Sequence, residues 1–131
     1  MPNKAIEIMG QSRSGEVLRG MYGDAAVQIR DIRDSDGRTY RVEFLSTPDG
    51  AHATARVLHN PWSRAGQGPN AGAGYLQSHV SPEGFVCVGE GAKYTLKDSV
   101  HDLDFVVKRT EFWVTGFSFF KENGCFPGTK E

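Results

Sequence analysis

The residues best suited to covalent chemistry lie in the stretch 79–88, which reads His-Val-Ser-Pro-Glu-Gly-Phe-Val-Cys-Val. Cys87 is the candidate nucleophile, because a thiolate is intrinsically reactive toward acyl carbon atoms. His79 precedes it by eight residues across a turn predicted at 81–84, so the two residues are expected to approach each other. The alternative is that Cys87 is a small buried hydrophobic residue without a chemical role.

His79 has two alternative roles. It either assists Cys87 directly, or it hydrogen-bonds the backbone of the turn and shapes the surroundings of the cysteine. We favour the second role, because the histidine of a cysteine hydrolase usually comes from elsewhere in the fold and no local protease signature is present.

Other kinds of site lack the required spacing. The four histidines and two cysteines form neither a Cys-x-x-Cys nor a His-x-x-x-His pair, so no metal site is expected. The glycine-rich segment 60–74 lacks the sequence context of a phosphate-binding loop, so we predict a surface loop and no nucleotide cofactor. A net charge of −1 with interspersed signs predicts no nucleic-acid partner.

The length and composition predict one domain over residues 1–131. No run approaches the roughly 18 apolar residues that a membrane span needs, and no secretory signal is recognised, so no membrane partner is expected. The two cysteines, Cys87 and Cys125, are too few for a disulfide framework. A reducing, cytoplasmic setting with free thiols is therefore expected.

The elements before Cys87 follow from alternation and turn residues. Three alternating runs, at 25–32, 40–45 and 51–59, are separated by Asp-Gly turns at 34–37 and 47–50, which predicts an antiparallel β-meander. Residues 75–80 are expected to be extended and to bring the strand count to four. A broken N-terminal helix is predicted over 4–21, with a strand at 5–9 as the alternative.

After Cys87, apolar residues recur every three or four positions and predict a long helix from Asp98 or Ser99 to Gly124. The β-propensity of this segment leaves a break near Thr110 as an alternative. Three phenylalanines spaced by seven, 105, 112 and 119, are expected to widen the buried stripe. Trp62 is expected to anchor the start of the glycine-rich loop against the core. The predicted fold class is α+β, with a β-meander of three to four strands and a helix at each end.

This order of elements, together with His79, Gly84 and Cys87, resembles the ubiquitin-conjugating enzyme family. In that family the active-site cysteine follows a histidine-containing turn, with a glycine three residues before it. Gly84 and Cys87 match that spacing, and Val88 matches the apolar residue that follows. The Trp113 helix and the Gly-Cys-Phe-Pro ending at 124–127 are similar to bacterial members, which belong to ubiquitin-like conjugation operons linked to antiphage defence.

The resemblance implies that Cys87 carries a ubiquitin-like protein as a thioester, without a cofactor. The implied partners are the ubiquitin-like protein, an activating enzyme and a target protein with a reactive amine. The family's His-Pro-Asn tripeptide is absent, because His79 is followed by Val-Ser, and Asn60 lies too far from Cys87 to inherit the oxyanion role. We expect backbone N–H groups near Gly89 and Gly91 to act instead. The alternatives are a noncatalytic β-rich adaptor domain and a small cysteine hydrolase.

Overall fold

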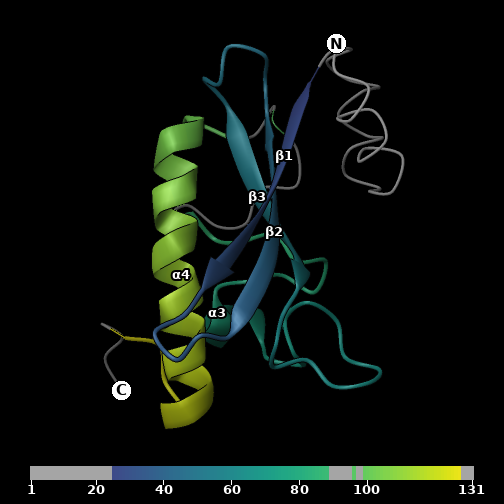
Figure 1. The fold of residues 1–131 in the computed structure, drawn as a ribbon, viewed down its shortest axis with the longest axis vertical. Helices are drawn as coiled ribbons and strands as arrows, with labels where there is room; N and C mark the ends of the chain where they lie inside the picture. Colours follow the sequence, from purple (N-terminus) through teal and green to yellow (C-terminus); the bar gives the residue numbers. More distant parts are fainter. Residues whose placement is uncertain (1–24, 89–95, 97–98, 128–131) are drawn as a thin grey trace.

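The structure, a computed structural model, describes residues 25–88, 96 and 99–127 (Figure 1). Its elements, in chain order, are β1 (Ala26–Arg33), β2 (Thr39–Ser46), β3 (Ala53–His59), the short helix α3 (Tyr75–Ser78) and the long helix α4 (Leu103–Asn123). The predicted α+β class is confirmed, because an antiparallel sheet in the order β1-β2-β3 packs against α4. The expected N-terminal helix falls outside the described residues.

The β-meander formed where the sequence predicted it. β1 pairs with β2 from Ala26↔Ser46 to Arg33↔Thr39, and β2 pairs with β3 in the same antiparallel sense. Gly37 and Gly50 close the two turns at φ values of 87° and 74°, which a residue with a Cβ rarely adopts. Local turn chemistry therefore sets the register of the sheet.

The central strand β2 is buried on both faces from Val42 to Ser46. Tyr40, Val42 and Phe44 pack in the cluster that includes α4, whereas Leu45 packs with Phe85 and other residues in a second cluster. Alternation along a strand places successive side chains on opposite faces, so one strand contributes to both clusters. The second cluster consists of Ala25, Leu45, Phe85 and Leu96, with Val27 partly buried against it.

The prediction of an extended segment at 75–80 was wrong for its first four residues, which form α3. This helix ends at His79, which adopts a left-handed conformation with φ 59° and donates its N–H to the Tyr75 carbonyl at 2.8 Å. Trp113 Nε1 donates to the Ser78 carbonyl at 2.9 Å, which fixes the end of α3 on α4. Residues 75–78 lack the alternation of a strand, and this contact with a distant element favours the helical turn.

Beyond α3, the segment 80–86 forms two isolated bridges in place of a regular fourth strand: Phe85 with Arg56 of β3, and Val80 with Val86 inside the segment. Val86 donates its N–H to the Ala55 carbonyl at 3.0 Å, and Val57 donates to the Gly84 carbonyl at 2.8 Å. Within the described residues the sheet is thus three-stranded, with a short hairpin hydrogen-bonded to its β3 edge.

Helix α4 starts at Asp102, whose carboxylate accepts the Phe105 N–H at 2.9 Å, so the prediction of a cap at Ser99 was wrong. The Ser99 hydroxyl donates instead to the Ala53 carbonyl of β3 at 2.5 Å. Asp98 lies outside the described residues. The helix continues through Thr110 without a break and ends at Gly124, which has φ 88° as expected of a C-terminal glycine. No helix in the described part of the chain is long and apolar enough to span a membrane.

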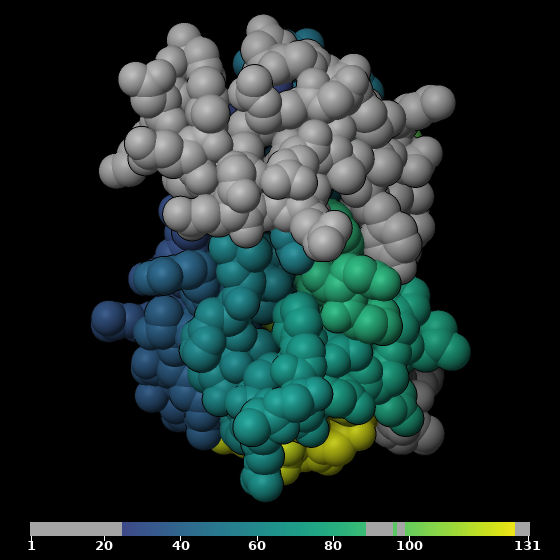
Figure 2. Space-filling model, turned by 90° about the vertical axis from the view of Figure 1, so that its right-hand side faces the viewer, coloured from purple at the N-terminus to yellow at the C-terminus, as the bar shows by residue number. Residues whose placement is uncertain are grey.

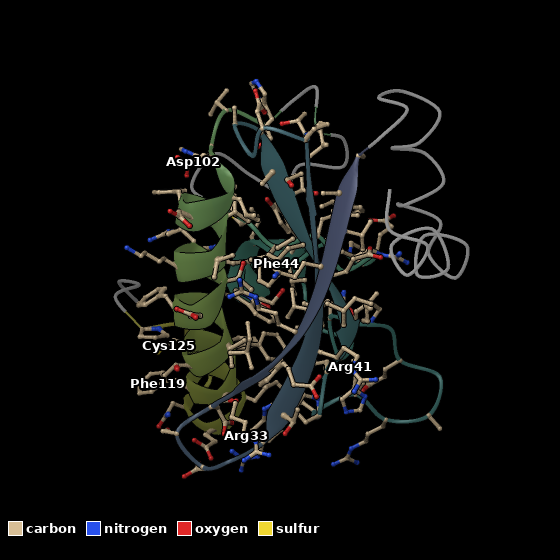
Figure 3. The ribbon with its side chains drawn as sticks, turned by 45° about the horizontal axis from the view of Figure 1, so that its top comes forward. Arg33, Arg41, Phe44, Asp102, Phe119 and Cys125 are labelled. Atoms are coloured by element: carbon tan, nitrogen blue, oxygen red, sulfur yellow. The ribbon has the colours of Figure 1, made fainter. Side chains whose placement is uncertain are left out.

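Phe105, Phe112 and Phe119 do not widen the buried stripe, because their exposed fractions are 39%, 51% and 41%. A spacing of seven returns to one side of a helix, and here that side faces away from the sheet, as Figure 3 shows for Phe119. The contrasting prediction for Trp62 is confirmed, since this side chain packs against the core and bonds Ser118 Oγ at 3.0 Å. The loop that Trp62 anchors contributes to the face turned away from α4 (Figure 2).

Candidate functional site

Cys87 lies at the base of the hairpin that begins at His79. The Cys87 N–H donates to the His79 carbonyl at 2.8 Å, so the backbones of the two residues face each other across the hairpin. Further along, the Ser81 N–H donates to the Phe85 carbonyl at 3.0 Å, which continues the pairing toward the turn. The structure therefore brings the two sequence-predicted site residues together, as the turn between them suggested.

Gly84 holds this hairpin against the rest of the fold. Its φ is 100°, and a Cβ at this position would come within 2.7 Å of the Val57 carbonyl and 3.1 Å of Pro69. Only glycine allows this close approach to both β3 and the 60–74 loop. The glycine three residues before Cys87 thus positions the cysteine by packing.

A cavity of about 220 Å³ opens beside the Cys87 thiol. Its walls come from the hairpin, from the middle of α4 and from the C-terminal tail, and its lining residues are His79, Cys87, Arg109, Phe112, Trp113, Phe126 and Pro127. We call this the Cys87 cavity. Both thiols are free and partly exposed, but Cys125 is not among the lining residues. Figure 3 shows Cys125 beside the outer side of α4.

The tail wall of the Cys87 cavity depends on a notch in α4. Gly116 is buried, and a Cβ on it would lie 2.5 Å from the ring of Phe126, so the missing side chain makes room for that ring. The Phe126 ring centroid lies 4.7 Å from that of His79 and 6.3 Å from that of Phe112. The tail therefore folds back along α4 and closes one side of the cavity.

The charge distribution in the cavity favours a neutral imidazole. Burial and the positive charge of Arg109 both lower the pKa of His79 below its ordinary value of 6.5. No described residue hydrogen-bonds a ring nitrogen of His79, so the side chain is available to assist while its carbonyl supports Cys87. Its two suggested roles are thus compatible in one residue.

The sequence did not identify Arg109, Phe112 or Phe126 as site residues. Arg109 lies on the exposed side of the helix, and its guanidinium carbon is 5.6 Å from the centroid of the Phe112 ring. One signal was present in the sequence: Gly116 interrupts a helix rich in aromatic residues, where glycine costs stability unless a close approach requires it.

The arrangement is suited to thiol chemistry. A partly exposed thiol, a neutral imidazole and aromatic walls lie together, but no carboxylate from the described part of the chain lines the cavity to orient His79. A hydrolase triad requires such an orienting group, whereas thioester exchange does not. The described residues also contain no group of three side chains able to hold a metal ion.

Asn60, which lies in the only His-Asn-Pro sequence of the chain, supports a loop. Its amide donates to the Pro69 carbonyl at 2.8 Å and accepts the Trp62 N–H at 2.9 Å, and the residue is buried. Both ends of its side chain are therefore engaged away from Cys87. The backbone donors expected near Gly89 and Gly91 fall outside the described residues.

Comparison with known proteins adds no relative: no family model matches the chain, and neither a curated protein nor a solved structure matches it. Function is therefore inferred from the chemistry and geometry of the site.

Proposed function

We propose that this chain carries a ubiquitin-like protein as a thioester on Cys87, receives it from an activating enzyme and transfers it to an amine of a target protein. The observation that supports this best is the placement of a partly exposed Cys87 thiol, held by a hairpin at the sheet edge, in a cavity beside α4. The β-meander before the cysteine and the helix after it also suit a ubiquitin-conjugating fold. The implied setting is a bacterial cytoplasmic conjugation pathway linked to antiphage defence.

The proposed reaction consists of two acyl transfers. The Cys87 thiolate attacks the thioester carbon on the activating enzyme, a new C–S bond forms, and the enzyme's thiolate leaves. A neutral target amine then attacks the Cys87 thioester, a C–N bond forms, and Cys87 is released as a thiolate while the amine loses a proton. His79, whose pKa is lowered by burial and by Arg109, is the proposed acceptor of that proton.

Charging with purified partners tests this proposal. Wild-type protein, incubated with its activating enzyme, ATP and the ubiquitin-like protein, should form an adduct that a thiol reagent cleaves. Cys87→Ser should form an ester that resists the same reagent, because an oxygen ester exchanges slowly with thiols. Cys125→Ser is the matched control and should charge like wild type. Failure of the wild-type protein to form a thiol-sensitive adduct would contradict the carrier function.

A noncatalytic protein-binding domain is the second candidate, and it is favoured by the exposed row Phe105, Phe112 and Phe119 on α4. Exposed aromatic side chains on one helix face are typical of interaction surfaces. Under this alternative, Cys87→Ala should leave biological activity intact, whereas Phe119→Asp should abolish it. Loss of activity in Cys87→Ala, with Phe119→Asp still active, would favour the carrier.

A further inference from the structure

Among its described lining residues, the Cys87 cavity has a positive charge and no counter-charge. Arg109 is its cationic lining residue, and none of its lining residues from the described ranges is a carboxylate. Arg109 forms no ion pair within the described part of the chain. By contrast, Arg38 contacts three carboxylates at 3.1–3.3 Å, and Arg41 contacts Asp31 at 2.9 Å.

We propose that the Cys87 cavity binds a carboxylate that lies near the group that reacts with Cys87. Arg109 would donate hydrogen bonds to this carboxylate, while Phe112 and Trp113 would pack against the apolar part of the same residue. This proposal names the substrate class of the proposed carrier, and its covalent step rests on the carrier function. The binding of a carboxylate by Arg109 does not depend on the carrier function.

The size of the cavity suits one side chain. About 220 Å³ is below the roughly 300–1,000 Å³ of pockets that enclose whole small-molecule ligands. Aromatic walls reduce the local dielectric response, which strengthens the attraction between a guanidinium and a carboxylate. The positive charge of Arg109 disfavours a cationic side chain in the cavity. His79, whose pKa is lowered, supplies no negative charge that would offset this repulsion.

The carboxylate has two conceivable sources in a carrier reaction. It belongs either to the C-terminal segment of the transferred protein, beside the acyl carbon, or to the target segment, beside the attacking amine. Both sources present the same chemistry to Arg109, so the two are separated by experiment.

The binding is tested with two alkylating reagents of similar size, anionic iodoacetate and neutral iodoacetamide. In each reaction the Cys87 thiolate displaces iodide, so one S–C bond forms and one C–I bond breaks. The iodoacetate-to-iodoacetamide rate ratio at Cys87 should fall roughly three- to fivefold in Arg109→Gln, the effect of one nearby charge in a partly solvated site. The Arg109→Lys variant should retain most of the wild-type ratio.

Two controls make this result specific. Lys108→Gln removes an exposed charge from the adjacent helix position, which does not line the cavity, and should leave the ratio unchanged. Cys125, measured in the same samples by mass spectrometry, should also keep its ratio. An equal ratio in wild type and Arg109→Gln, or an equal fall in Lys108→Gln, would overturn the proposal. No other protein is needed, so the test is independent of the charging experiment.

The two sources are separated with short peptides. Ethyl thioesters of a glycine-ended peptide, with Asp or Asn before the glycine, are exchanged onto Cys87 with release of ethanethiol. The acyl peptide is then transferred from Cys87 to the lysine amine of a second peptide, which carries Asp or Asn beside the lysine. If the first step prefers Asp over Asn and Arg109→Gln abolishes this preference, the carboxylate belongs to the transferred protein. If the same is found in the second step, the carboxylate belongs to the target. An Arg109-independent Asp/Asn ratio in both steps would refute the proposal.

Discussion

Helix α4 contributes to two polar regions of opposite character. Near its C-terminal end, Ser118 joins a cluster with Asp34, Arg38, Tyr40 and Trp62, which we call the Ser118 cluster. The Ser118 hydroxyl donates to Asp34 Oδ2 at 2.6 Å, pairs with the Tyr40 hydroxyl at 2.6 Å and accepts the Trp62 Nε1–H at 3.0 Å. About two turns closer to its N-terminus, α4 lines the Cys87 cavity, which contains polar groups without such partners in the described part of the chain.

The difference indicates which region stabilises the fold and which is available to a ligand. Buried polar groups that are fully hydrogen-bonded fix the packing of the elements that supply them. The Ser118 cluster joins the β1–β2 turn, β2, the start of the 60–74 loop and α4 in this way. Exposed groups such as Arg109, which has no ion pair in the described part of the chain, add little stability and can bind a ligand.

The titration behaviour of the Ser118 cluster agrees with its structural role. Burial raises the pKa of Tyr40 to about 12, so its hydroxyl stays protonated. Burial also acts to raise the pKa of Asp34, but hydrogen bonds from Ser118 and Arg38 outweigh it and hold that pKa below 3.8. The cluster therefore contains a stable carboxylate and a stable phenol at neutral pH.

The largest effect is expected from Ser118→Ala. The substitution removes one hydroxyl and leaves three partners without it, so the free energy of unfolding should fall by about 2–4 kcal/mol. Cys87→Ala should lower it by less than about 1 kcal/mol, because the thiol is partly exposed. Urea unfolding measures both, with the exposed Thr115→Ala as the control on the same helix. Equal losses in the Ser118 and Cys87 variants would remove the contrast between the two regions.

The next effect concerns Gly116, the notch that seats Phe126. Gly116→Ala places a Cβ 2.5 Å from the Phe126 ring, so the tail should be displaced and the free energy of unfolding should fall by about 1–2 kcal/mol. Cys87 should then react faster with iodoacetamide, because one wall of its cavity has moved. Phe126→Ala removes the same wall and should accelerate the reaction similarly. Unchanged labelling in both variants would show that the tail does not limit access to Cys87.

A pH-dependent effect is expected from Asp34. Its pKa is lowered on folding, so the stabilisation that it contributes is complete above the unfolded pKa of about 3.9 and is lost as the pH falls through the lower folded pKa. The difference in stability between wild type and Asp34→Asn should therefore shrink as the pH falls below about 4. Denaturant unfolding of both proteins at roughly pH 7, 5, 4 and 3 measures this difference. A constant difference over this range would show that Asp34 is not a buried, hydrogen-bonded anion.

The smallest effect is expected at His79. Removing the charge in Arg109→Gln should raise the pKa of His79, although burial, the larger cause, should keep it below 6.5. Because the unfolded state binds the proton more readily, the protonation of His79 should destabilise the fold only as the pH falls below about 6.5. NMR titration of the His79 ring protons measures the pKa, with Lys108→Gln as the control. A pKa that does not move would show that Arg109 lies too far from the imidazole to influence it.

Much of the framework could be predicted from the sequence, because it depends on interactions between near neighbours. Two Asp-Gly turns and the alternation of apolar residues were enough to predict the three strands. The turn at 81–84 was enough to predict that His79 approaches Cys87. The length of α4 and its glycine end followed from a repeat of three and four residues. In each case the decisive contacts lie within a few positions along the chain.

The tertiary structure decided what depends on segments far apart. Ser99 does not cap α4 because its hydroxyl bonds β3, and 75–78 is helical with its end held by Trp113. The exposure of the three phenylalanines spaced by seven depends on which side of α4 the sheet covers. Arg109 and Phe126 lie beside Cys87 because α4 packs next to the hairpin and the tail folds into the Gly116 notch. Sequence periodicity determines which residues share a face, but only packing determines what that face contacts.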